Sequence, residues 1–137
     1  MNTTSLPSSE AFRCEPVTLH ADLRGCVFEP VTPGEIPAQR NVHIVLSEPG
    51  AIRGNHFHQR GTEIAVVLGL CLVRVRLAEG VRDFLVPAGE AWRFVFPPGV
   101  PHAFRNIGDR TQFMTAFNTE AHDQKQPDVV REVLIES

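Results

Sequence analysis

The sequence predicts an all-β fold, either a sandwich or a barrel. Turn signals such as "EPG", "AEG", "PAGE" and "PPGVP" recur roughly every 8–12 residues, between short segments rich in Val, Ile, Phe and Leu. Eleven prolines and ten glycines suit many turns and oppose long helices. Only "VVREVLI" (129–135) could form a short helical turn, and it could equally be a strand. We expect one domain over residues 11–137, after a flexible Ser/Thr/Pro-rich segment over residues 1–10.

Four segments carry the clearest strand patterns. In chain order they are "NVHIVLSE" (41–48), "CLVRVRL" (71–77), "AWRFVF" (91–96) and "QFMTAFN" (112–118). Side chains alternate between the two faces of a strand. In the first segment His43 therefore lies on the face opposite Val42 and Ile44, and in the second Arg74 and Arg76 share one face.

Composition excludes several classes of function. The net charge is −3 and no basic stripe is present, so we expect no nucleic-acid partner. No apolar run approaches the roughly 20 residues of a membrane span, so we expect no membrane partner. The single lysine, Lys125, lies in a polar segment, which argues against a lysine Schiff base, and the chain has no tyrosine. The expected partner is a small-molecule substrate.

The cysteines favour a reducing compartment. Cys14, Cys26 and Cys71 form no CxxC motif, and their odd number argues against a disulfide framework. Cys71 lies in an apolar run and is expected in the core. The N-terminal "MNTTSLPSSE" lacks the basic and apolar pattern of a signal peptide. We therefore expect a cytoplasmic protein.

The stretch "RGNHFHQRGTE" gathers residues that can bind a metal. His56 and His58 are two apart on an expected strand, so their rings share a face about 6.6 Å apart along it. Glu63 follows a short loop and could begin the neighbouring antiparallel strand, which would return it to the same place. His102, after the rigid "FPPGVP" turn, is the remaining candidate.

Three histidine nitrogens and one carboxylate oxygen form a mixed set that suits Zn, Fe, Ni, Cu or Mn. Each residue alone has a simpler interpretation. The two histidines could be solvated polar positions, Glu63 could lie on the surface, and the His102 ring could bond a backbone carbonyl. It is the joint spacing of the residues that favours a site.

That spacing resembles the two motifs of the cupin superfamily, over about residues 50–69 and 89–106. The matching residues run Gly50-x5-His56-x-His58-x4-Glu63-x5-Gly69, and then Pro97-x-Gly99-x2-His102-x3-Asn106. Gly69 comes one residue early, and Gly89, which opens the second motif, two residues early. The resemblance implies a small cupin barrel, also called a double-stranded β-helix or jelly roll. The metal ligands that it implies are His56, His58, Glu63 and His102.

A narrower resemblance covers most of the chain. "RGNHFH", "VRVR", "PPGVPHAFRNIGD" and "FNTEAHDQKQPDVV" are similar to the C-terminal cupin domain of bifunctional capsular-polysaccharide nucleotide-sugar enzymes. There the cupin half binds zinc and epimerises a 4-keto sugar, beside a reductase half. "DLRGCVFE" (22–29) resembles the opening of deoxysugar 3,5-epimerases and 3,4-ketoisomerases. This sequence departs from these enzymes in having no GxGxxG motif and no counterpart of the 3,5-epimerases' tyrosine acid.

The resemblance implies an isomerase or epimerase that acts next to the ketone of a keto sugar, carried on a nucleotide, or of a related intermediate. It also implies a divalent metal, zinc first, with Fe, Ni or Mn as alternatives, and a homodimer paired through edge strands. The metal would be the electrophile, so a base must be found elsewhere. His43 is the first candidate, because histidine titrates near neutral pH. Glu63 is the second candidate, if it leaves the metal.

Five residues are expected to contact the substrate. They are Arg53, Asn55, Arg74, Arg76 and Trp92. The arginines could bind a diphosphate or carboxylate with paired hydrogen bonds. Asn55 belongs to the "RGN" of the nucleotide-sugar resemblance, and Trp92 would be a pocket wall. Alternatively, the face that carries Arg74 and Arg76 is simply solvated.

Other functions remain compatible with the same residues. A metal-dependent dioxygenase, lyase or cyclase of secondary metabolism could use three histidines and a glutamate. A non-catalytic cupin that binds a small ligand, or a closed structural metal site, would need no base at all.

Overall fold

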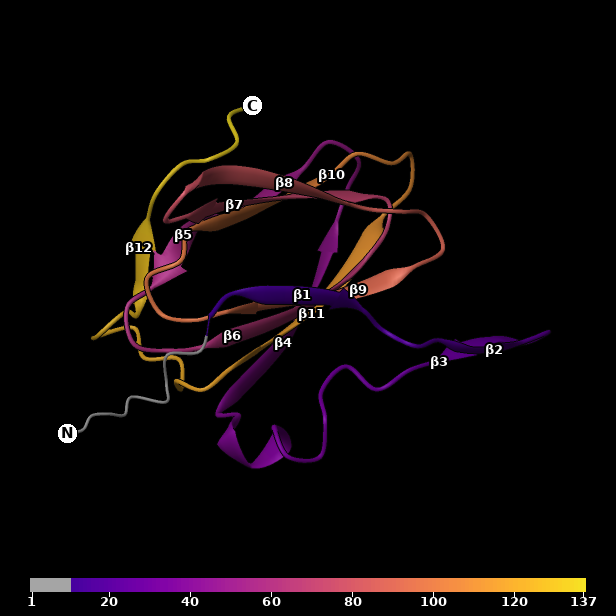
Figure 1. The fold of residues 1–137 in the computed structure, drawn as a ribbon, viewed down its shortest axis with the longest axis horizontal. Helices are drawn as coiled ribbons and strands as arrows, with labels where there is room; N and C mark the ends of the chain where they lie inside the picture. The colour runs from indigo at the N-terminus through magenta and orange to yellow at the C-terminus, as the bar shows by residue number, and fades with distance from the viewer. Residues whose placement is uncertain (1–10) are drawn as a thin grey trace.

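The computed structural model describes residues 11–137, so the expectation for residues 1–10 lies outside the described residues. Two five-stranded antiparallel sheets face each other, and a two-stranded hairpin stands apart (Figure 1). The first sheet, in spatial order, consists of β1 (Arg13–Pro16), β9 (Ala91–Phe96), β6 (Glu63–Leu68), β11 (Gln112–Asn118) and β4 (Asn41–Ser47). The second consists of β12 (Val129–Arg131), β5 (Ile52–His58), β10 (His102–Asn106), β7 (Cys71–Leu77) and β8 (Gly80–Val86). The predicted all-β fold is confirmed.

The strands predicted from alternation lie where expected. β7, β9 and β11 have the predicted bounds, and β4 ends one residue early, at Ser47. The ambiguous segment 129–135 contributes the strand β12 and no helix. Within residues 11–137 the structure has no helix with the length and apolar character to cross a membrane.

The route to Glu63 differs from the expectation. Glu63 was expected on a strand beside the two histidines, but β5 pairs with β10 and β12, whereas β6 pairs with β9 and β11. Residues 59–62 therefore cross from one sheet to the other. As a result Glu63 faces the histidines from the opposite sheet. The prediction that Glu63 begins the strand next to His56 and His58 is wrong.

The main core lies between the sheets. Val73 and Val75 of β7 are fully buried there, and Phe94 and Phe96 pack together with ring centroids 6.0 Å apart. Phe104, from the opposite sheet, meets Phe96 edge to face at 6.0 Å. This aromatic packing joins the two sheets. A cavity lies beside it and is lined in part by Phe104.

The N-terminal part of the described chain covers the outer face of the first sheet. Val17 and Phe28 pack against the buried Ile64 of β6. The cover is fastened by the Arg93 guanidinium, which donates to both carboxylate oxygens of Glu35 at 2.9 and 2.5 Å. Glu35 directly precedes the 3-10 helix η1 (Ile36–Ala38).

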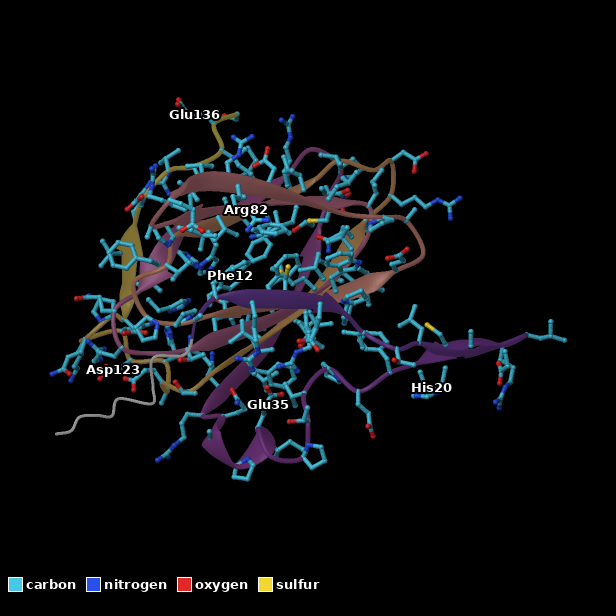
Figure 2. The ribbon with its side chains drawn as sticks, viewed as in Figure 1. Phe12, His20, Glu35, Arg82, Asp123 and Glu136 are labelled. Carbon is cyan, nitrogen blue, oxygen red and sulfur yellow. The ribbon has the colours of Figure 1, made fainter. Side chains whose placement is uncertain are left out.

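Exposed apolar side chains are found, among other places, on the two-stranded hairpin and on one edge strand. The hairpin projects from the barrel, with His20 well away from the body in Figure 2, and it exposes Leu23. Its strands are β2 (His20–Asp22) and β3 (Gly25–Val27). On the edge strand β4, Val42, Ile44 and Leu46 point outward and are 56%, 63% and 59% exposed. The predicted homodimer could bury this edge. It stays a prediction, which sedimentation of the purified protein would test.

Candidate metal centre

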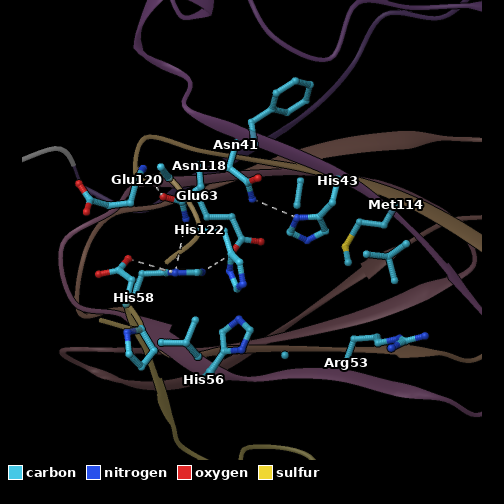
Figure 3. A pocket seen from close by; sticks show the side chains of 18 of the residues that line it. Asn41, His43, Arg53, His56, His58, Glu63, Met114, Asn118, Glu120 and His122 are labelled. Carbon is cyan, nitrogen blue, oxygen red and sulfur yellow. Dashed lines mark hydrogen bonds and ion pairs between the residues drawn. The ribbon is translucent and has the colours of Figure 1, made fainter. Parts of the chain in front are cut away.

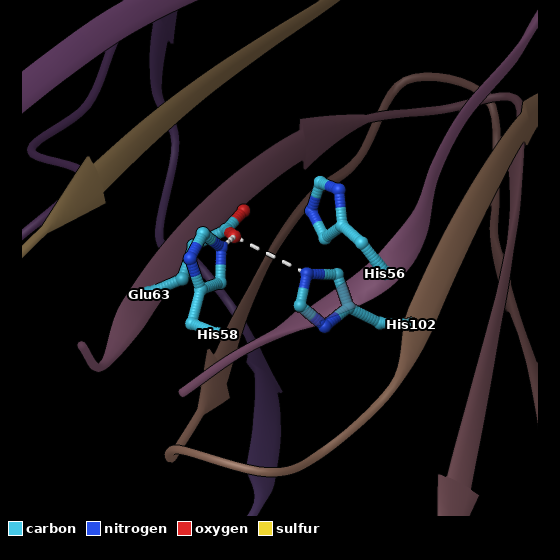
Figure 4. A group of neighbouring side chains, drawn as sticks. All are labelled: His56, His58, Glu63 and His102. Carbon is cyan, nitrogen blue, oxygen red and sulfur yellow. Dashed lines mark hydrogen bonds and ion pairs between the residues drawn. The ribbon is translucent and has the colours of Figure 1, made fainter. Parts of the chain in front are cut away.

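The structure brings the four predicted metal ligands together (Figure 4). The set is His56 and His58 from β5, His102 from β10, and Glu63 from β6 on the opposite sheet. One ligand atom from each lies within 4.8 Å of the others. Their role as metal ligands stays a prediction, but both sheets contribute to one donor set.

A bulge in β5 aims its side chains. His56 lies opposite His102, and Gly54 lies opposite Ala103, so Asn55 has no partner in the ladder. Gly54 and Asn55 have φ values of +83° and +57°. A bulge adds one residue to one strand and re-aims its side chains. Arg53 and His56, three residues apart, can therefore both line the pocket.

Asn55 holds this bulge from behind. Its Oδ1 accepts hydrogen bonds from the amides of Leu134 and Ile135 at 2.8 and 3.0 Å, and its Nδ2 donates to the Ile135 carbonyl at 3.0 Å. The side chain is buried against the C-terminal segment and does not line the pocket. Asn55 shapes the strand that carries Arg53 and His56, and its predicted contact with substrate stays a prediction. Asparagine suits the role because it tolerates the left-handed region.

His102 is the most constrained of the four residues. It is fully buried and stacks on Phe96, with ring centroids 3.8 Å apart. Its Nδ1 donates to the Val100 carbonyl at 2.9 Å, so in the neutral ring Nε2 carries a lone pair. That nitrogen lies 3.2 Å from Glu63 Oε1, which is also an acceptor. Two facing acceptors need a proton or a cation between them, so the donor set fits a metal.

His58 and His56 complete the set. His58 Nε2 lies 2.6 Å from the same oxygen, Glu63 Oε1. The His56 ring meets those of His58 and His102 edge-on, with centroids 5.1 and 5.0 Å apart. Three nitrogens and one carboxylate oxygen are typical ligands of zinc and of first-row transition metals.

The electrostatics keep most of this set ready for a cation. Burial, with the nearby His102, lowers the pKa of His56 to about 4. For Glu63, burial alone would raise the pKa, but His102 and His58 together hold it well below its usual range. For His58, burial would lower the pKa, but the Glu63 and Asp128 carboxylates outweigh it and raise the pKa. A proton therefore competes with a metal for His58 more strongly than for an ordinary histidine.

We expect zinc affinity to fall as the pH drops through the raised pKa of His58. Below that pKa a proton must leave His58 before zinc binds, whereas above it none is displaced there. One displaced proton changes the affinity about tenfold per pH unit. His56, with its pKa of about 4, adds no competition in this range. The check is a zinc titration between about pH 5 and pH 8, and a flat affinity across it would contradict the charge arrangement.

A cavity of about 510 Å³ opens beside the cluster (Figure 3). His43 of β4 and Arg53 of β5 line it together with His56, His58 and Glu63. His43 lies near Asn41, whose Nδ2 is 3.5 Å from its Nδ1. Arg53 donates to Ser47 Oγ at 3.2 Å and has no carboxylate partner among residues 11–137. One candidate base and one cation therefore face the same cavity as the cluster.

Three other predicted contacts lie outside this cavity. Arg74 pairs with Asp83 at 2.7 Å, and Arg76 pairs with Glu132 at 2.7 Å, both on the outer face of the second sheet. Trp92 donates its Nε1–H to Glu90 at 2.9 Å and packs against the core. These three residues do not line this cavity, and their contact with substrate stays a prediction. The alternation of β7 that buries Val73 and Val75 places the two arginines on the solvent side.

Sequence reasoning missed the segment that roofs the pocket. Asn118, Glu120, His122 and Asp128 all line it, from the polar stretch that leads to β12. No spacing relates these residues to the motif near residues 53–63. The local signals were the hydrophilic composition of "NTEAHDQKQPD" and the resemblance of "FNTEAHDQKQPDVV" to the capsular-polysaccharide enzymes, and neither assigned a role to a single residue.

The profile of the polysaccharide biosynthesis C-terminal domain family matches residues 20–130, which include all four cluster residues. The chain belongs to this family. The predicted resemblance to capsular-polysaccharide enzymes is thereby confirmed. The chain is also similar to oxalate decarboxylase OxdC of Bacillus subtilis (strain 168), with 29% identity over 97 residues. The match covers 69% of this chain and only 25% of that protein.

Solved structures extend the comparison. CapF, a capsular polysaccharide assembling protein of Staphylococcus aureus, has a TM-score of 0.64 at 26% identity, over 87% of this chain and 35% of that chain. QdtA, a sugar 3,4-ketoisomerase from Thermoanaerobacterium thermosaccharolyticum solved in complex with TDP, has a TM-score of 0.69 at 14% identity, over 90% of both chains. The second likeness shows the fold alone. The predicted cupin barrel is confirmed, although the family member spans about a third of CapF.

Proposed function

We propose that this protein is a metal-dependent isomerase or epimerase. Its substrate would be a keto sugar carried on a nucleotide, or a related biosynthetic intermediate, and the reaction would occur at the carbon next to the ketone. The observation that carries the proposal is the convergence of three imidazoles and one carboxylate beside a cavity of about 510 Å³. The likeness to CapF and to a sugar 3,4-ketoisomerase supports the sugar substrate.

The four ligands would hold one divalent ion, and zinc suits them best, with Fe, Ni or Mn as alternatives. Such an ion, when bound, would act as a Lewis acid that polarises a carbonyl oxygen. His102 is locked by Phe96 and Val100, so its Nε2 would supply a fixed point for the site. Glu63 would partly neutralise the ion, because its carboxylate is held in the charged form.

His43 would move the proton. It approaches the cavity from β4, on the sheet opposite the three histidines, so a substrate between them could present its acidic carbon to this ring. A ring nitrogen of His43 would take the proton from the carbon next to the carbonyl. In an isomerisation it would return this proton to the former carbonyl carbon, while the neighbouring hydroxyl loses its proton and the former carbonyl oxygen gains one. In an epimerisation a proton from solvent would add to the same carbon on the opposite face. Glu63 is less suited to this role, because it contacts both His58 and His102.

Arg53 would bind an anionic part of the substrate. Its guanidinium reaches the pocket because of the bulge at Gly54 and Asn55, and within residues 11–137 no acidic side chain occupies it. A guanidinium that is not paired with a carboxylate can bind a phosphate or carboxylate with two parallel hydrogen bonds. The substrate would thus lie between this cation and the histidine cluster.

The test is solvent deuterium uptake. The zinc-loaded protein, incubated in deuterated water with a panel of nucleoside-diphosphate 4-keto sugars, is expected to place deuterium next to the carbonyl. His43→Asn should slow uptake by roughly 10²–10⁴-fold, as for loss of a general base, without changing zinc content. His20→Asn, on the projecting hairpin, serves as the matched control and should be unaffected. No uptake from any sugar of the panel would overturn the proposal.

The relative OxdC favours a second candidate, a metal-dependent lyase. OxdC is an oxalate decarboxylase, and its match spans 69% of this chain. This candidate predicts carbon dioxide release from oxalate by the metal-loaded protein, with Arg53 holding a carboxylate. Release without any deuterium uptake from keto sugars would favour the lyase. If neither reaction occurs, a ligand-binding cupin without catalysis would remain.

A further inference from the structure

Asp128 contacts a predicted metal ligand from outside the donor set. Its Oδ2 lies 3.4 Å from His58 Nδ1, and both side chains are only 11% exposed. Asp128 immediately precedes β12, whose first residue, Val129, lies opposite His58 in the sheet. The contact therefore joins the C-terminal segment to the first motif, 70 positions apart in the chain.

The motif's own turn holds this carboxylate in place. Oδ1 accepts from the Arg60 amide at 2.7 Å, and Oδ2 accepts from the Gly61 amide at 3.1 Å. The Asp128 carbonyl accepts from the Gln59 amide at 2.8 Å. Three successive amides of the turn after His58 are thus bonded to Asp128. Its oxygen faces the ring in a fixed direction and does not swing freely in solvent.

The two ring nitrogens of His58 have different surroundings. Nε2 faces Glu63 and the cluster, whereas Nδ1 faces Asp128 Oδ2 and the Asn118 amide nitrogen, each at 3.4 Å. The Asn118 Oδ1 accepts from the Glu120 amide at 2.7 Å, which turns Nδ2 toward the ring. Nδ1 therefore meets one acceptor and one donor, and the two favour opposite tautomers of the neutral ring.

Only one tautomer can bind a metal through Nε2. That nitrogen must present a lone pair, so the ring proton must be on Nδ1, where an acceptor is needed. Metal-binding histidines generally donate the other ring N–H to a carboxylate or a carbonyl. His102 donates its Nδ1–H to the Val100 carbonyl in this way. At His58 Nδ1 the acceptor that the structure provides is Asp128 Oδ2.

We propose that Asp128 is a positioning residue that accepts the Nδ1 proton of His58 and so presents Nε2 to the metal. Asn118 then supports the other tautomer, in which Nε2–H donates to Glu63. The inference rests on the proposed metal centre, but not on the reaction that the centre performs. Asp128, although it lies in the roof of the pocket, would in this way support the metal site.

The first test compares two variants by zinc affinity, measured in competition with a chelator. Asp128→Asn keeps the size of the side chain but removes the charge and one acceptor, and should weaken zinc binding by about 10–100-fold. Glu120→Gln is the matched control. This substitution removes the 3.2 Å ion pair of Glu120 with Arg60, which belongs to the turn that holds Asp128. Glu120 does not face His58, so the zinc affinity of this variant should equal that of the wild type. Equal affinity of Asp128→Asn and the wild type would overturn the inference.

The second test needs no variant to fold. NMR of the ring nitrogens in the zinc-loaded wild type should show His58 bound through Nε2, with a slowly exchanging Nδ1 proton. Zinc on Nδ1, or an Nδ1 proton that exchanges as freely as that of an exposed histidine, would overturn the inference. Zinc binding with this signature but without deuterium uptake would end the proposed isomerase and leave Asp128 in its role.

Discussion

Replacing His56 with alanine is expected to abolish stoichiometric zinc binding. The variant removes one of only four donors, and the remaining three cannot close around the ion with the same geometry. The loss should exceed the ~10–100-fold that is usual when a residue behind a ligand is changed. Elemental analysis of the purified protein, followed by zinc titration, measures it. His56 is half-buried, so the substitution disturbs the core less than the same change at His102 would.

His43→Ala is the control for this experiment. His43 lines the same cavity but lies outside the donor set, so this variant should keep its zinc. Unchanged metal content in His56→Ala would refute the ligand assignment. Loss of metal from both variants would instead indicate that the cavity had collapsed, and the melting temperatures of the two would reveal this.

Replacing Asn55 with alanine is expected to cost about 3–5 kcal/mol of unfolding free energy. The change removes three hydrogen bonds and leaves the buried backbone groups of Ile135 and the partly buried amide of Leu134 without these partners. It also places an alanine at φ +57°, which an L side chain other than Asn or Asp adopts at a penalty of roughly 1–2 kcal/mol. Urea unfolding of the metal-free protein measures the loss.

Asn55→Gly separates the two causes. Glycine adopts the left-handed region freely but makes none of the hydrogen bonds. The glycine variant should therefore be more stable than the alanine variant by roughly the 1–2 kcal/mol penalty of the left-handed conformation. It should still be less stable than the wild type. A loss of less than about 1 kcal/mol of unfolding free energy in Asn55→Ala would mean that the hydrogen bonds of Asn55 to Leu134 and Ile135 do not hold the bulge.

Much of the fold was predictable because it follows local rules. The alternation in residues 71–77 requires that one face be buried, and the structure buries Val73 and Val75. The same rule places Arg74 and Arg76 on the opposite face, outside the core, which agrees with the alternative that this face is solvated. Their partners, Asp83 and Glu132, complete that solvent face.

The candidate site was predictable only in part. The spacing of the two motifs identified all four residues of the donor set, which are His56, His58, Glu63 and His102. The path of Glu63 was wrong because a four-residue connection can either turn back beside its strand or cross to the opposite sheet, and local sequence does not distinguish these. Asn55 is bonded to residues 134–135, and Asp128 contacts His58. Both contacts depend on the C-terminal segment, whose position follows from the tertiary fold. The Gly-Asn pair in "RGNHFH" was nevertheless a readable signal for a bulge.

The central claim is that two sheets contribute four ligands to one metal ion. Anomalous diffraction at the zinc edge, from crystals of the zinc-loaded protein, tests this claim most directly. We expect one strong peak within coordination distance of His56, His58, Glu63 and His102, roughly 2.0–2.2 Å from each ligand atom. A zinc ion located elsewhere, or a peak that leaves Glu63 and His102 paired to each other, would contradict it.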